Sequence, residues 1–349
     1  MKTWASAKSM KLAIGLIILI TIAVTADILL LTQRWNPAGA AQTGEVYRYW
    51  WFQLLVIVLL VNLSACTIDN AVKRIKARSR NIGLWGSTVF HAGLIVILIG
   101  TIVSGNFRMF STIKLIQGES KQIPYGALTT EDTILKGDQE PFQLTLRDQQ
   151  VDLAGNGKLK DNYSTIELSN GDKTASYRLA DRQEVLYRGI YMFPSLYGYA
   201  VQLTVTPNTA QAPQELSIPM DTMEYAEGIK AYLHQGYRNS QLPFAISFNF
   251  YPDLEGRGST GGYINQSNSL GQPGLDINIA GTGGPAVEKV VRLGESIDTQ
   301  GFQIKFSGVK PWTQLTSVYD PGASIVFGGI LVAIIGFSAF SLLTKRKGI

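Results

Sequence analysis

Residues 84–103 read LWGSTVFHAGLIVILIGTIV and contain no Asp, Glu, Lys or Arg. A stretch of this length matches the roughly 20 residues that a helix needs to cross a bilayer core. A helix also satisfies its own backbone polar groups, as lipid requires. Soluble core helices rarely stay apolar on every side over such a length, so this stretch predicts a transmembrane helix.

Three further stretches have the same character: Leu12–Leu31, Trp51–Cys66 and Ala323–Leu343. The first of them follows several lysines and could be a signal peptide. It is longer, however, than an h-region of about 7–15 residues, and no clean small-residue cleavage site follows it. We therefore expect four transmembrane helices, the first of which is retained.

The basic residues predict the orientation of these helices. They gather before the first helix, in the expected loop between the second and third, and after the fourth: Lys2, Lys8, Lys11, Lys73, Arg74, Lys76, Arg78, Arg80, Lys345, Arg346 and Lys347. The positive-inside rule then places both termini in the cytoplasm. The expected organisation is three helices in residues 1–104, an outer domain in residues 105–320, and the fourth helix with a cytoplasmic tail in residues 321–349.

Charge and cysteine content exclude several classes of function. Residues 105–320 hold 18 basic and 23 acidic residues, whereas the rest of the chain holds 13 basic and 3 acidic ones. The basic excess is therefore a signal of topology and of the lipid bilayer, and it predicts no nucleic-acid partner. Cys66 is the only cysteine, so a disulfide framework and a CxxC redox enzyme are both excluded.

The outer domain has the period-two alternation of half-buried strands. The alternating segments are Ser111–Leu115, Phe142–Leu146, Tyr163–Leu168, Val201–Thr206, Phe244–Phe250, Leu275–Ile279 and Phe302–Phe306. Turn signals such as Asn170-Gly171 separate them. We expect a sandwich-like or barrel-like antiparallel fold, a short helix at Met223–Leu233 and a long flexible loop at Gly256–Gly274. The fold class is thus membrane α plus β, with a large antiparallel β-rich domain between helices three and four.

His91 is the main candidate for chemistry. It lies in the third helix, about seven residues and hence about 10 Å from the cytoplasmic end. An ionisable residue at that depth suggests a function, and imidazole is a standard axial ligand of haem iron. A histidine hydrogen-bonded across a helix interface is an equally good interpretation. Ser87 and Thr88 lie one turn earlier, and Gly86, Gly93 and Gly100 recur every seven residues, as in closely packed helices.

The remaining residues give little sign of catalysis. His234 is interpreted as a lone surface histidine, and the chain has no HExxH, GxSxG or P-loop motif. The sequence therefore assigns no catalytic residue, and we do not expect an enzyme that acts by itself. Trp312 and Tyr319 precede the fourth helix, where an interfacial aromatic belt is the favoured interpretation. A flat cofactor stacked on such residues is a weaker alternative.

Several short motifs, in this order and topology, resemble the ResB family of the system II cytochrome c maturation machinery. They cover most of the chain: residues 6–11 (SAKSMK), 51–52 (WF), 62–66 (NLSAC), 91–94 (HAGL), 161–165 (DNYST), 187–191 (YRGIY), 197–198 (YG) and 320–322 (DPG), followed by Gly328, Gly329 and Gly336. Some members have a further histidine just before the last helix. Residues 300–321 contain none here, and that role is not transferred to His234.

The resemblance implies a function, a cofactor and partners. It implies a cytochrome c biogenesis factor that binds and exports haem b with a ResC/CcsA-type membrane protein, which joins haem to apocytochrome c. His91 would be one axial ligand of the haem iron, and the partner would give the other. The implied location is the cytoplasmic membrane, or the thylakoid membrane in a photosynthetic source. The alternative is a ResB-like haem-binding or structural subunit of a quinol-linked respiratory complex.

Overall fold

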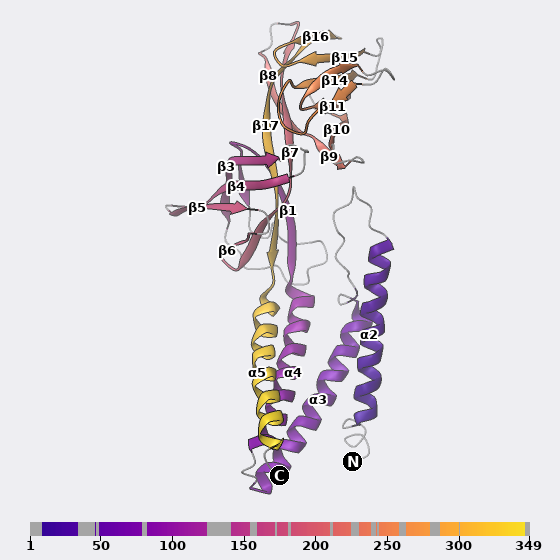
Figure 1. Ribbon diagram of the computed structural model, residues 1–349, viewed down its shortest axis with the longest axis vertical. Coiled ribbons are helices and arrows are strands. Elements are labelled where there is room, and N and C mark those ends of the chain that lie inside the picture. Colours follow the sequence, from indigo (N-terminus) through magenta and orange to yellow (C-terminus); the bar gives the residue numbers. More distant parts are fainter. Residues whose placement is uncertain are drawn as a thin grey trace. The chain divides into compact units, whose positions relative to one another are not determined.

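The computed structural model describes residues 9–33, 46, 49–78, 82–123, 141–153, 159–171, 173–180, 183–209, 212–224, 230–238, 242, 244–257, 263–279, 287–299 and 301–345. The chain divides into two compact units. One unit contains the helices and the other contains most of the strands (Figure 1). Residues 1–8 and 346–349, for which a cytoplasmic side is predicted, lie outside the described part.

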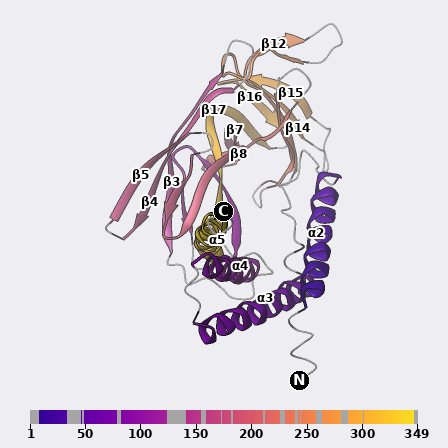
Figure 2. The same ribbon diagram turned by 60° about the horizontal axis from the view of Figure 1, so that its bottom comes forward.

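The helical unit has four long apolar helices, as expected from the sequence. They are α2 (Met10–Gln33), α3 (Trp50–Lys76), α4 (Ile82–Phe107) and α5 (Pro321–Lys345). Each is long and apolar enough to cross a membrane. In both ribbon views α4 and α5 run side by side (Figure 2).

One expectation about this unit is wrong, because α3 is longer than its apolar stretch. Lys73, Arg74 and Lys76 belong to its last turns and not to a loop. No Gly or Pro interrupts the chain between Cys66 and Lys76. The cations also lie at the helix C-terminus, where the macrodipole favours positive charge. Lys73 forms an ion pair with Asp69 one turn earlier, with 2.9 Å between Nζ and Oδ2.

The described residues of the β-rich unit form four sheets, and the first is built on two long strands, β7 (Ile190–Pro207) and β17 (Phe302–Tyr319). Its order is β1-β17-β7-β6, with β16 paired to β17 and β8 to β7. The shorter strands are β1 (Met109–Ile116), β6 (Val185–Tyr187), β8 (Gln214–Pro219) and β16 (Ser296–Thr299). The turn between β6 and β7 places both Arg188 and Gly189 at positive φ, which is the geometry of a tight two-residue hairpin.

The second sheet has the order β15-β14-β11-β10-β9 and is antiparallel throughout. Its strands are β9 (Asp221–Glu224), β10 (Lys230–Tyr237), β11 (Ile246–Tyr251), β14 (Gly274–Ile279) and β15 (Val287–Arg292). The third sheet has the order β2-β3-β4-β5, with β2 (Ser120–Ile123), β3 (Phe142–Leu153), β4 (Leu159–Asn170) and β5 (Lys173–Ala180). The small fourth sheet pairs β12 (Leu254–Arg257) with β13 (Tyr263–Asn265).

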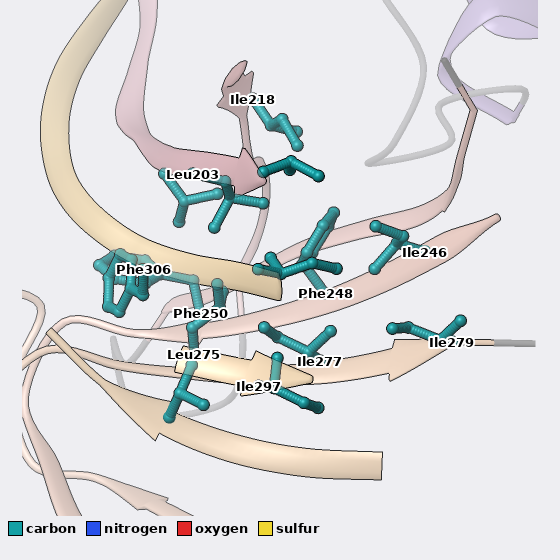
Figure 3. Close-up of a cluster of buried hydrophobic side chains, with 14 of the residues drawn as sticks. Leu203, Ile218, Ile246, Phe248, Phe250, Leu275, Ile277, Ile279, Ile297 and Phe306 are labelled. Atoms are coloured by element: carbon teal, nitrogen blue, oxygen red, sulfur yellow. The ribbon is translucent and has the colours of Figure 1, made fainter. Parts of the chain in front are cut away.

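The main core of this unit lies between the first two sheets, as in a β-sandwich. Leu203 of β7 and Phe306 of β17 come from the first sheet, and Phe248 and Ile277 come from the second (Figure 3). Each has less than 1 % of its surface exposed. All seven segments predicted as strands lie wholly or largely in strands of the structure, and the alternation of apolar residues was therefore a sound guide to this core.

Two local expectations in this unit are wrong. The described parts of Met223–Leu233 are strand and not helix, because residues 221–224 form β9 and residues 230–237 form β10. Residues 225–229 lie outside the described part. Tyr232 is buried in the core, and its neighbour Leu233 is only half-buried, which is the alternation of a strand. Gly256–Gly274 is not one long loop, since β12 ends and β13 lies within it. Residues 258–262 of that stretch lie outside the described part.

Trp312 is not part of an interfacial belt, since it is 2 % exposed inside β17. Its Nε1 donates a hydrogen bond to the carbonyl oxygen of Tyr199, at 3.0 Å. Gly198 packs against the indole so closely that a Cβ there would lie 2.8 Å from Cζ2. The Lys114 ammonium lies 4.5 Å from the ring centroid. These protein contacts occupy the indole within the β-rich unit.

Candidate functional site

The site is built on the tight pairing of α4 and α5. Glycines recur every seven residues in both helices and meet in an antiparallel register: Gly86 with Gly336, Gly93 with Gly329, and Gly100 with Gly322. A Cβ on Gly93 would lie 2.7 Å from the Gly329 carbonyl oxygen, and one on Gly86 would lie 2.8 Å from that of Gly336. Such contacts leave no room for a side chain, so the two backbones touch. One face of α4 is thereby closed by α5.

Asp320 fixes the end of this helix pair at which α4 ends and α5 begins. Its Oδ1 accepts hydrogen bonds from the backbone N–H groups of Gly322 and Ala323, both at 3.1 Å. The same oxygen accepts a hydrogen bond from the Ser104 hydroxyl, at 2.6 Å. The carboxylate thus caps the first turn of α5 and ties that turn to α4.

His91 lies on the opposite face of α4 from the glycines. It precedes Gly93 by two residues, which is about 160° around a helix with 3.6 residues per turn. Its Nδ1 lies 2.7 Å from the carbonyl oxygen of Ser87, one turn earlier. Phe90 packs edge-on against the imidazole, with 5.5 Å between the ring centroids, and it also contacts Phe337 of α5. The ring is half-buried and held from one side.

The bond to Ser87 determines which nitrogen of His91 can bind a metal. A carbonyl oxygen only accepts hydrogen bonds, so Nδ1 carries the hydrogen. The neutral ring then has its lone pair on Nε2, the usual arrangement of a metal-binding histidine whose other nitrogen is held by a backbone carbonyl. The sequence left two interpretations open for His91, a haem ligand or a histidine hydrogen-bonded across a helix interface. At Nδ1 the hydrogen bond does not cross an interface, because its partner Ser87 belongs to α4 itself.

Helix α3 contacts α4 on the His91 side of the glycine stripe, both below and above the histidine. Near the N-terminus of α4 the Arg74 guanidinium donates to the Leu84 carbonyl oxygen and to the Thr88 hydroxyl. Toward the C-terminus of α4, Phe52 and Val56 pack with Leu98 and Ile102. Counted around the α4 helix, the α4 members of these contacts lie within about 60° of His91.

The donor set fits haem better than a bare metal ion. Within the described ranges no group of three or more His, Cys, Asp or Glu residues could hold a metal. Haem supplies four nitrogens to its iron from the porphyrin and needs only one or two axial ligands from protein. A single neutral imidazole with a free Nε2 matches that need.

His234 lies in the other unit and is held differently. It is half-buried in β10, with Nδ1 3.3 Å from the Pro219 carbonyl oxygen and its ring against Tyr237. Sequence reasoning missed the contact of Arg74 and the cap of Asp320. It also missed the register of the α5 glycines, although their seven-residue spacing matches that of the α4 glycines and could have revealed it.

Most of the chain matches a known protein family. Residues 77–348 match the ResB-like family. Two cytochrome c biogenesis proteins CcsB, both from Synechococcus, are similar in sequence. The protein of strain CC9902 is 21 % identical over 280 residues, which are 80 % of this chain and 57 % of the relative. The protein of strain RCC307 is 23 % identical over 277 residues, which are 78 % of this chain and 55 % of the relative.

The chain therefore spans a little over half the length of these curated relatives. Among solved structures, the cytochrome c haem lyase CcmF aligns with 93 % of this chain and 34 % of its own, at 10 % identity and a TM-score of 0.31. That similarity is too low to support an argument about the fold. The family match covers well over half of the residues, and on that ground the chain belongs to the ResB-like family.

Proposed function

We propose that this chain is a cytochrome c biogenesis factor that binds haem b at His91 and, with a ResC/CcsA-type partner, exports it for attachment to apocytochrome c. One observation carries the proposal, namely the hydrogen bond from Nδ1 of His91 to the Ser87 carbonyl oxygen. It leaves Nε2 as the ligand atom within a helix that can cross a membrane. The family and the names of the two relatives support the same function.

The residues around His91 have defined roles in this proposal. The Ser87 carbonyl holds the ring in one tautomer and orients Nε2 away from the helix backbone bond. The glycine contacts with α5 keep the opposite face of α4 closed, so only the face toward α3 or a partner would be open to haem. His91 would hold the haem iron through Nε2, and a residue of the partner would supply the second ligand. Attachment itself needs the cysteines of the apocytochrome.

The proposal is tested on the chain purified with its membrane partner, by comparing haem spectra of the parent, His91→Ala and His234→Ala. Loss of axial imidazole from the spectrum is expected only for His91→Ala, and added free imidazole should restore it. Cytochrome c maturation in a deletion strain should then fail with His91→Ala and succeed with His234→Ala.

Unchanged haem content in His91→Ala would overturn the ligand assignment. Normal maturation of cytochrome c in the deletion strain would overturn the biogenesis function. Together with a retained haem, that second result would favour the quinol-linked respiratory subunit.

A further inference from the structure

Arg74 is a cation held at the inner approach to His91. Only residues 77–81 separate α3 from α4, so the chain itself keeps the end of α3 beside the start of α4. The guanidinium contacts Leu84 and Thr88. Thr88 precedes His91 by three residues, which is about 4.5 Å along a helix axis. Arg74 is therefore anchored less than one turn below the imidazole.

The anchored guanidinium retains unused capacity for an anion. Both of its bonds use Nη1 and end on neutral oxygens. Among the described residues no carboxylate pairs with Arg74, whereas the neighbouring Lys73 is neutralised by Asp69. A guanidinium presents five donors in a planar fork that matches a carboxylate in bidentate fashion. A half-buried arginine with its charge unpaired and its position fixed is suited to bind a carboxylate ligand.

The helix geometry places that anion site and the metal-ligand site on one side of α4. Counted from His91, Leu84 and Thr88 lie about 20° and 60° around the helix. Haem b carries carboxylate groups along one edge of its porphyrin. A ligand with a metal at its centre and anions at its edge is complementary to a neutral imidazole that has a cation one turn away.

We propose that Arg74 binds a carboxylate of the porphyrin whose iron is held by His91, and that it thereby selects porphyrins with free carboxylates. This inference rests on the proposed function, because it requires haem at His91. The haem site would then combine the iron ligand His91 on α4 with a carboxylate-binding residue, Arg74, on α3. Arg74 then acts in binding and orientation, and the iron ligand remains His91.

The test measures binding of iron protoporphyrin IX and of its dimethyl ester to the full chain in lipid nanodiscs, by absorbance titration. The ester keeps the iron and the ring but lacks the negative charges. The parent should prefer the free acid by about tenfold, as expected for one charge-assisted bond. Arg74→Gln should lose that preference while it binds the ester as the parent does.

Control variants separate this role from a structural one. Arg74→Lys keeps the charge and should keep a preference of a few fold. Lys76→Gln removes an exposed cation two residues away and should keep the full preference. A thermal unfolding curve for each variant shows whether the helices remain assembled.

Two results would overturn the inference. One is a full preference for the free acid in Arg74→Gln, and the other is an equal loss of affinity for acid and ester. A failure of the proposed function has a different signature, namely unchanged binding of both porphyrins in His91→Ala.

Discussion

Replacement of Gly329 by alanine tests the backbone contact between α4 and α5. A Cβ at Gly329 would lie 2.8 Å from the Ile97 amide nitrogen and 2.9 Å from the Gly93 carbonyl oxygen. Both are backbone atoms of α4, so neither can rotate aside and the helices must separate. Overpacking of this kind costs about 1–3 kcal/mol. At 1.4 kcal/mol for each factor of ten, the unfolding equilibrium constant should rise roughly 5- to 150-fold relative to an alanine at an uncrowded position of the same helix.

Gly328 provides a matched control on the same helix. A Cβ at Gly328 would meet nothing within 4 Å. Alanine there should be neutral or slightly stabilising, because it favours helix by about 1 kcal/mol over glycine. The assay is unfolding of the purified chain in mixed detergent micelles, followed by circular dichroism. Equal stabilities of Gly329→Ala and Gly328→Ala would refute the antiparallel glycine register.

Other predictions concern the cap of α5 and two buried groups of the β-rich unit. Asp320→Ala removes three hydrogen bonds and should lower the stability of the helical unit by about 1–2 kcal/mol in the same assay, with Asp320→Asn losing less. Burial raises the pKa of Asp276, with a lesser contribution from Glu288, so its folded pKa lies above its unfolded one. The free energy of unfolding is then greatest below the unfolded pKa of Asp276 and falls as pH rises through the folded pKa. Because asparagine has no charge to bury, Asp276→Asn should raise Tm at pH 7 but change it little at acidic pH. Burial raises the pKa of Tyr199 to about 12, so alkaline absorbance titration should show this phenol ionising late. Tyr199→Phe should remove that late step and cost about 1 kcal/mol, because its hydroxyl donates to the Asn268 carbonyl oxygen at 2.8 Å.

The helices and strands were predictable because their signals are local. Apolar length defines a membrane helix, and alternation defines a half-buried strand. The failure at Met223–Leu233 shows the limit of that rule, since a short amphipathic run fits either period. Pairing with β9 and β11 determines that residues 230–237 of β10 form a strand.

The candidate site was predictable only in part. Depth within an apolar helix singled out His91, but the tautomer depends on a hydrogen bond to Ser87 that helix formation creates. The contact of Arg74 with Thr88 depends on how far α3 continues past its apolar stretch. Trp312 was misplaced because its distance from α5 along the chain gave no sign of its packing on Gly198.

The pairing of α4 with α5 also has a consequence for the unit inserted between them. Strand β1 begins two residues after α4 ends, and β17 ends two residues before α5 begins. The hydrogen bond between Ser104 and Asp320 therefore closes a loop of roughly two hundred residues. Bringing together the ends of a flexible chain of that length costs about 5 kcal/mol in conformational entropy. In a secreted domain a disulfide commonly restricts the unfolded chain in this way. Here the only cysteine is Cys66, in α3, and the close pairing of α4 with α5 takes the place of such a cross-link.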